Sequence, residues 1–237
     1  MRVDKETGLG HGRPEDVYVY EAPVRVWHWF MVFCVVILAP TGFLIGAPLH
    51  SFWGEATGLF FVGWIRMIHV VVGLLLIATF VLRLYWGVVG NRFARQLFYI
   101  PFWNGNWWSG LFRQAGYYLF VRDDTEHWVG HNPLAQAAMF GMFLTSFVVL
   151  IVTGLGLYAQ PYGWGSAWMN AFGWVTTLLG TPQAVRTVHH VAMYVLLLFA
   201  GVHFYMVIRE DVMGGETVFG VMGSGIRMFK RNPHPGN

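Results

Sequence analysis

Charged residues are scarce in this chain of 237 residues: Asp, Glu, Lys and Arg make up 11% of it, whereas hydrophobic residues make up 56%. Soluble domains carry about 25% charged residues, so this composition excludes a soluble enzyme, a disordered chain and a secreted disulfide-rich module. The 12 Trp and 20 Phe residues are also too many for a water-exposed globule of this size to bury. The composition therefore predicts an integral membrane protein.

Cysteine is nearly absent, since Cys34 is the only one. A single cysteine excludes an internal disulfide, a cysteine-ligated zinc ion and a cysteine-held iron–sulfur cluster. The lack of a Cys-x-x-Cys-His motif also excludes haem attached through thioether bonds. The modest net charge of +3 gives no reason to expect nucleic acid as a partner.

Acidic and basic residues are missing from the cores of four long apolar segments, and a membrane-spanning helix needs about 20 residues. We therefore predict an all-α fold, an integral membrane four-helix transmembrane bundle, formed by one domain over residues 1–237. The predicted spans are residues 27–47, 65–88, 133–159 and 187–208. Pro40 is expected to kink the first span, and Arg83 in the second must snorkel or find a partner.

Two further apolar segments, 93–120 and 162–179, lie in the connections between the second and third spans and between the third and fourth. Both are interrupted by glycine and are rich in Trp and Tyr, residues that favour the headgroup region. We predict that both are interfacial segments, with a fifth span in the first as the alternative. The second can also dock a partner protein.

Lys and Arg are distributed very unevenly around the predicted spans. Of the 15 such residues, only Arg66 and Arg186 fall on the side opposite the two chain ends. The positive-inside rule then predicts that the polar N-terminal segment, 1–25, and the tail, 209–237, are both cytoplasmic. The first 25 residues lack the pattern of a cleaved secretory signal, so we expect this segment to be retained.

Histidine is the notable polar residue at the predicted membrane depth. The candidates are His28, His69, His189, His190 and His203. His189 and His203 are 14 residues apart on one predicted helix, so they differ by about 40° in direction and about 21 Å in height. The same arithmetic puts His190 about 140° away from His203. His189 is therefore the expected member of the pair, and His190 is the alternative.

The direction of each span sorts these histidines into two pairs of matching depth. His69 and His189 fall near the outer surface, and His28 and His203 fall near the inner one. Two imidazoles that face each other from different helices are the axial ligands of a bis-histidine haem b, which leaves no open position at the iron. We therefore predict two haem b groups that transfer electrons. A haem-free anchor or transporter, in which these histidines only pack, is the remote alternative.

Three of these histidines follow an arginine by three residues: Arg25, Arg66 and Arg186 occupy those positions. Each arginine lies on the same helix face as its histidine and nearer the water, where it can pair with a haem propionate. The alternative is that these arginines only end the spans at the membrane surface.

Quinone binding requires an apolar slot with groups that handle protons. At the predicted cytoplasmic end, His131 and Asn132 are the candidates, and this end also holds Asn91, Glu126 and Tyr20. A contact at the start of the third span is the alternative role for His131.

Four segments resemble the b-type cytochrome subunit of membrane-bound nickel–iron hydrogenases: Val19–Trp29, Arg66–His69, Gly130–Ala135 and Arg186–Tyr194. The resemblance extends over the whole chain and implies a multi-pass protein of the bacterial inner membrane. It implies a dihaem anchor that passes electrons from the small subunit of a periplasm-facing hydrogenase, bound to its large subunit, through the outer and inner haems to quinone. The chain would then be an electron-transfer subunit and would not itself react with hydrogen.

Other four-helix cytochromes with two haems, such as the gamma subunits of formate dehydrogenases, share only the histidine pattern. The same module serving formate dehydrogenase, or another periplasmic oxidoreductase, is therefore the main alternative function.

Overall fold

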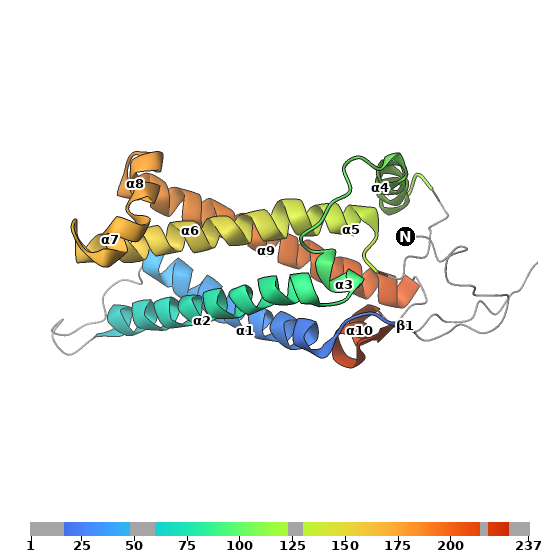
Figure 1. Cartoon of the computed structure of the whole chain (residues 1–237), viewed down its shortest axis with the longest axis horizontal. Helices are drawn as coiled ribbons and strands as arrows, with labels where there is room; N and C mark the ends of the chain where they lie inside the picture. The colour runs from blue at the N-terminus through green and yellow to red at the C-terminus, as the bar shows by residue number, and fades with distance from the viewer. Residues whose placement is uncertain (1–16, 48–59, 123–129, 214–217, 228–237) are drawn as a thin grey trace, which may run out of the picture. The chain divides into compact units, whose positions relative to one another are not determined.

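The computed structural model describes residues 17–47, 60–122, 130–213 and 218–227, and these residues are mainly helical (Figure 1). Within them, four helical segments are long and apolar enough to cross a membrane. They are α1 (Ala22–Gly46), α2 (Phe61–Val89), the segment Pro133–Tyr162, and α9 (Pro182–Met213). The predicted class, an all-α integral membrane protein with four spans, is confirmed. Each of these segments contains one of the predicted spans, except that the first predicted span extends one residue, Ala47, beyond α1.

The long helices follow from the membrane as solvent. Their most apolar windows have a mean hydropathy between 2.2 and 2.4, and backbone groups in lipid must be paired within the segment itself. Helix α1 has 25 residues and continues through Pro40. The hydroxyl of Thr41, the next residue, donates to the carbonyl oxygen of Ile37 at 2.8 Å.

The third span is built from several helical types. Helix α5 (Pro133–Ala138) starts at Asn132, whose side chain accepts from the amide of Ala135, and continues into the π-helical segment η2 (Met139–Leu144). Helix α6 (Thr145–Ala159) and the 3-10 turn η3 (Gln160–Tyr162) complete the span. Hydropathy cannot signal the π-helical segment, because it does not report which carbonyl each amide pairs with.

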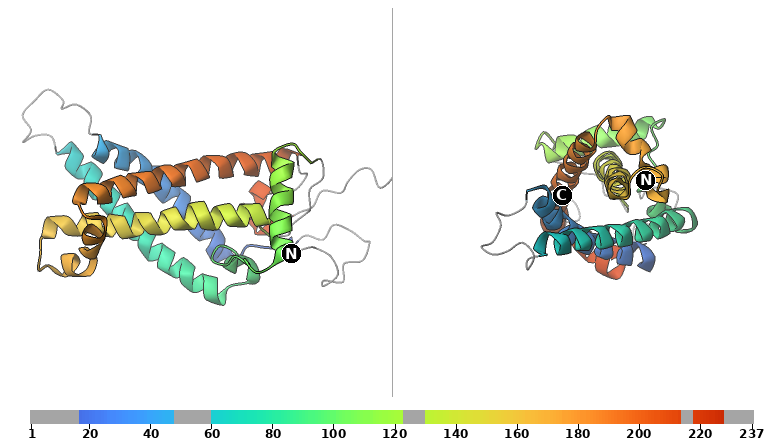
Figure 2. Two further views of the ribbon diagram at one scale, coloured as in Figure 1. Left: turned by 90° about the horizontal axis from the view of Figure 1, so that it is seen from above. Right: turned by 90° about the vertical axis from the view of Figure 1, so that its left-hand side faces the viewer.

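The two connections contain short helices. Residues 93–120 include most of α3 (Arg92–Arg95) and all of α4 (Gly105–Tyr118), while residues 162–179 contain α7 (Ala167–Phe172) and α8 (Trp174–Leu179). Helix α4 has 14 residues and is therefore about 21 Å long, too short for a fifth span across roughly 30 Å of hydrocarbon. In Figure 2, α4 runs across the end of α5, as an interfacial helix would.

A small β-ribbon joins the two flanks of the chain, which sequence analysis did not predict. Strand β1 (Val17–Tyr18) pairs antiparallel with β2 (Ile226–Arg227), which follows α10 (Val218–Ser224). Next to the ribbon, Val19 packs with Phe93 and Val221. The ribbon brings the two flanks together, and an even number of spans such as four is consistent with that pairing.

The chain divides into two compact units, whose boundaries fall within the long helical segments. The first contains the described residues before Val26, the described residues of Trp86–Phe147, and those from Tyr194 onward. The second contains the described residues of Val26–Tyr85 and Val148–Met193. The single domain over residues 1–237 stays a prediction.

Candidate haem and quinone sites

The second unit brings together His69 of α2 and His189 of α9. Their ring centroids are 6.5 Å apart and their planes make an angle of 64°. Both side chains are half-buried. The structure therefore places the two imidazoles of the predicted outer pair edge to face, from two different spans. Their role as iron ligands stays a prediction.

The surroundings of this pair fit the predicted haem iron. Two imidazoles that bind one metal ion from opposite sides, each at about 2 Å, have ring centroids roughly 6 Å apart, close to the observed 6.5 Å. Glycines lie against both rings: a Cβ at Gly42 would lie 3.4 Å from Cε1 of His69, and a Cβ at Gly154 would lie 3.3 Å from Cε1 of His189. The bare backbone thus forms a cradle on each side, which a larger residue would fill.

Each ring also has a hydroxyl partner that sequence analysis missed. The Oγ1 atom of Thr41 lies 2.9 Å from Nδ1 of His69, and that of Thr153 lies 2.8 Å from Nδ1 of His189. A usable signal was present, because both threonines precede a glycine near the same end of their spans as the outer histidines. Hydrogen bonds of this kind orient the histidines of metal sites.

The ring of His190 lies edge-on to that of His189, with centroids 6.4 Å apart, but both of its nitrogens have contacts elsewhere. Its Nδ1 atom is hydrogen-bonded to the carbonyl oxygen of Arg186 at 2.8 Å. Its Nε2 atom approaches α1, where a Cβ at Gly46 would lie only 2.7 Å from it. The geometry therefore favours His189 over His190 as the partner of His69.

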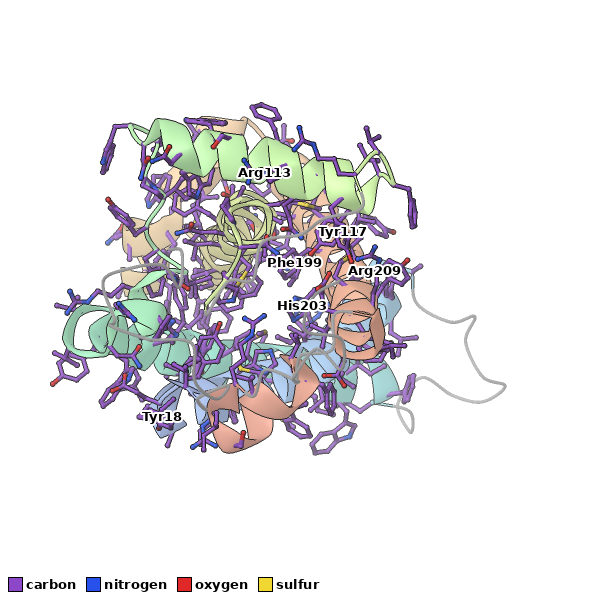
Figure 3. All side chains as sticks on the ribbon, turned by 90° about the vertical axis from the view of Figure 1, so that its right-hand side faces the viewer. Tyr18, Arg113, Tyr117, Phe199, His203 and Arg209 are labelled. Carbon is purple, nitrogen blue, oxygen red and sulfur yellow. The ribbon has the colours of Figure 1, made fainter. Side chains whose placement is uncertain are left out.

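The other two histidines of the predicted set belong to different units. His28, in the second unit, is half-buried and makes an edge-to-face contact with Trp29, with centroids 5.4 Å apart. His203, in the first unit, is exposed and stacks on Phe199, with centroids 5.6 Å apart and planes at 13° (Figure 3). Their pairing stays a prediction from their spacing in the sequence.

The arginines that precede the histidines have varied surroundings. Nη1 of Arg25 donates to the carbonyl oxygen of Gly223 within the first unit. Arg66 and Arg186 are exposed, and Nη1 of Arg186 lies 3.5 Å from Oε1 of Gln183. Binding of haem propionates by these three arginines stays a prediction.

Two buried arginines have aromatic partners. Arg83 is 4% exposed, and its guanidinium carbon lies 5.5 Å from the ring centroid of Trp27. The indole ring is thus a partner for this arginine within the span. In the first unit, the guanidinium of Arg209 lies 4.6 Å from the ring of Tyr117 and 5.1 Å from that of Tyr118, as Figure 3 shows for Tyr117. Burial raises the pKa of Tyr118 to about 12.

The predicted quinone residue His131 lies in a polar cluster of the first unit. The hydroxyl of Tyr20 is 3.2 Å from both ring nitrogens of His131. Gln96, which sequence analysis missed, accepts from the backbone amide of His131 at 3.1 Å and lies 3.2 Å from its Nδ1 atom. This cluster can relay a proton, because its phenol and imidazole both donate and accept hydrogen bonds.

The other quinone candidates have local structural roles or lie outside the described residues. Oδ1 of Asn132 accepts from the amide of Ala135 at 2.7 Å and starts α5, while Nδ2 donates to the hydroxyl of Tyr118 at 3.3 Å. Asn91 starts α3 and donates to the carbonyl oxygen of Val19 at 2.9 Å. Glu126 lies outside the described residues.

Comparison with known proteins gives consistent results along the chain. A family model described as "Prokaryotic cytochrome b561" matches residues 19–225. A protein of Rhizobium leguminosarum bv. viciae, named "Probable Ni/Fe-hydrogenase B-type cytochrome subunit", is 44% identical over 216 residues, covering 91% of this chain and 90% of the relative. The "Probable Ni/Fe-hydrogenase 1 B-type cytochrome subunit" of Escherichia coli (strain K12) is 42% identical over 217 residues, covering 90% of this chain and 91% of the relative.

Proposed function

The chain belongs to the prokaryotic cytochrome b561 family, and from this premise we propose that it is the dihaem subunit that carries electrons from a nickel–iron hydrogenase to quinone. The names of the relatives favour hydrogenase over formate dehydrogenase as the partner enzyme. The observation that carries the proposal is the pair His69 and His189, whose ring centroids are 6.5 Å apart between two membrane spans.

His69 and His189 would hold one haem b through its iron. We propose His28 and His203 as ligands of a second haem b, because the separation of 14 positions between His189 and His203 corresponds to about 21 Å along a helix. Haem, when bound, supplies a one-electron redox couple. The protein fixes the imidazoles of His69 and His189 on separate helices and orients them through Thr41 and Thr153.

The cluster of His131, Tyr20 and Gln96 is the proposed site of quinone reduction. Quinone takes up a proton for each electron, and the imidazole of His131, hydrogen-bonded to a phenol, can donate one. Gln96 contacts both the backbone and the ring of His131, which holds the imidazole in place.

We propose that both chain ends are cytoplasmic in a bacterial inner membrane. The β-ribbon supports a common side for the two flanks, and the distribution of Lys and Arg supports the cytoplasm as that side. Residues 162–179, which include α7 and α8, would then face the periplasm, where the hydrogenase small subunit, bound to its large subunit, would dock. Exposed aromatic rings support this docking role: Trp164 is 79% exposed and Trp174 is 52% exposed.

Haem stoichiometry in the purified chain tests the proposal. The wild-type chain should contain two haems, and His69→Ala and His28→Ala should each lose one, because each change removes a ligand of a different haem. His131→Ala is the matched control: it should keep both haems and slow quinone reduction by about 100-fold or more, the usual contribution of a proton donor. A colourless wild-type protein, or no haem loss in either ligand variant, would refute the proposal. Copurification with a nickel–iron large subunit tests the partner.

A further inference from the structure

The two histidines of the outer pair have the same local support, from two different helices. His69 of α2 contacts Thr41 and Gly42 of α1, and His189 of α9 contacts Thr153 and Gly154 of α6. In each case, the threonine Oγ1 atom lies within 2.9 Å of the ring Nδ1 atom. The repeated arrangement indicates a shared task for the two Thr-Gly pairs.

The number of available protons determines the direction of these hydrogen bonds. A threonine hydroxyl has one hydrogen, whereas a backbone carbonyl oxygen can only accept. Oγ1 of Thr41 lies 2.8 Å from the carbonyl oxygen of Ile37, and Oγ1 of Thr153 lies 2.6 Å from that of Val149. With its hydrogen on the carbonyl oxygen of its own helix, each hydroxyl accepts from the histidine. Nδ1 of each ring is then the donor and carries the proton.

A neutral imidazole with a proton on Nδ1 has its lone pair on Nε2. We infer that Thr41 and Thr153 are positioning residues that hold both histidines in the tautomer whose Nε2 atoms bind the haem iron, an inference that rests on the proposed function. The hydroxyls act through the histidines, in the way that hydrogen-bond partners commonly fix the tautomer and orientation of metal-ligating histidines.

The neighbouring glycines make this contact possible. A Cβ at Gly42 or Gly154 would lie 3.4 or 3.3 Å from Cε1 of the adjacent histidine. Absence of that Cβ lets the edge of each ring lie against the helix backbone while its Nδ1 atom reaches the threonine. The hydrogen bond and the backbone contact together restrict rotation of the imidazole, so each lone pair keeps one direction.

Valine substitutions test the inference because they preserve the shape of threonine and remove its hydroxyl. Thr41→Val and Thr153→Val, each in the full chain, should weaken haem retention at the outer pair by about 10- to 100-fold. They should also raise the potential of that haem, because an imidazole without a hydrogen-bond acceptor gives less electron density to the iron. Thr41→Ser and Thr153→Ser keep the hydroxyl and should restore wild-type behaviour.

Thr79→Val is the matched control, because the hydroxyl of Thr79 donates to the carbonyl oxygen of Leu76 on the same helix, at 3.0 Å. The readouts are haem retention, the two midpoint potentials from a redox titration, and the EPR spectrum of the oxidised protein. The inner haem records whether each variant is folded. Valine variants with wild-type values would overturn the inference, and so would the loss of both haems, since a positioning residue acts on one site. A wild-type chain without haem would instead refute the proposed function.

Discussion

Replacing Gly154 with alanine tests how closely the ring of His189 is held against α6. The added Cβ would lie 3.3 Å from Cε1 of His189 and 3.9 Å from its Nδ1 atom. Carbon atoms pack best at about 3.5–4.0 Å, so the ring must retreat by a few tenths of an ångström. That movement lengthens the hydrogen bond from Nδ1 to Thr153, now 2.8 Å, and turns Nε2 away from its present direction.

The expected cost follows from two opposing effects. Overpacking of this kind costs about 1–3 kcal/mol, and it acts on the ligand geometry. Alanine is better than glycine in a helix by about 1 kcal/mol, and this gain acts on the fold. We therefore expect Gly154→Ala to bind the outer haem about tenfold more weakly, since a factor of ten corresponds to about 1.4 kcal/mol, while thermal unfolding changes little.

The assay measures the rate at which the reduced protein loses haem to an excess of a haem-free acceptor protein, recorded as a change in absorbance. EPR of the oxidised protein adds a second readout, because it responds to the angle between the two imidazole planes. Gly141→Ala, in the same span, is the control: its Cβ would meet no atom within 4 Å. If Gly154→Ala retained haem as well as Gly141→Ala and had an unchanged EPR spectrum, the proposed close packing of His189 would be wrong.

Three further predictions concern other parts of the chain. His189→Ala should remove one haem per chain whereas His190→Ala should keep both, as measured by haem content, because the ring of His189 lies against that of His69 and Nδ1 of His190 is bonded to the carbonyl oxygen of Arg186. Arg83→Met and Trp27→Leu should show a coupling of about 0.5–2 kcal/mol in a double-mutant cycle of thermal stability, the energy of their cation–π contact; additive effects would contradict it. The pKa of Tyr118 is raised from its ordinary value of about 10 to about 12. The stability that its neutral phenol contributes is therefore fully present below about pH 10 and is lost as the pH rises from about 10 to about 12. The wild-type chain and Tyr118→Phe should therefore show the same rise in phenolate absorbance near pH 10, and the wild-type chain should show one additional group that titrates near pH 12.

The positions of the spans were predictable because the bilayer imposes a length and a composition on each helix. The proximity of His69 and His189 was also predictable, since chain direction places both near the same ends of neighbouring spans. These inferences depend on coarse properties, namely depth and helix direction. The choice between His189 and His190 already required the angular period of a helix, and the contacts of His190 with Arg186 and Gly46 support it.

The remaining features depend on individual contacts. Thr41 and Thr153 were missed because a threonine inside a span usually satisfies its hydroxyl on its own helix; the Thr-Gly sequence marks their place in the spans but does not identify the histidine that each contacts. Gln96 was missed for a similar reason, because its contact with His131 joins residues 35 positions apart. The β-ribbon has only two residues in each strand, too few for a periodic pattern.

The ribbon between β1 and β2 has a consequence for biosynthesis. Residues 17 and 18 leave the ribosome before any span has been made, whereas their partners, residues 226 and 227, are synthesised after the last span. Strand β1 therefore waits unpaired during translation, and the ribbon closes only after every intervening helix has been inserted. A polypeptide truncated after α9 would lack this closure and leave Val19 without its packing partner Val221.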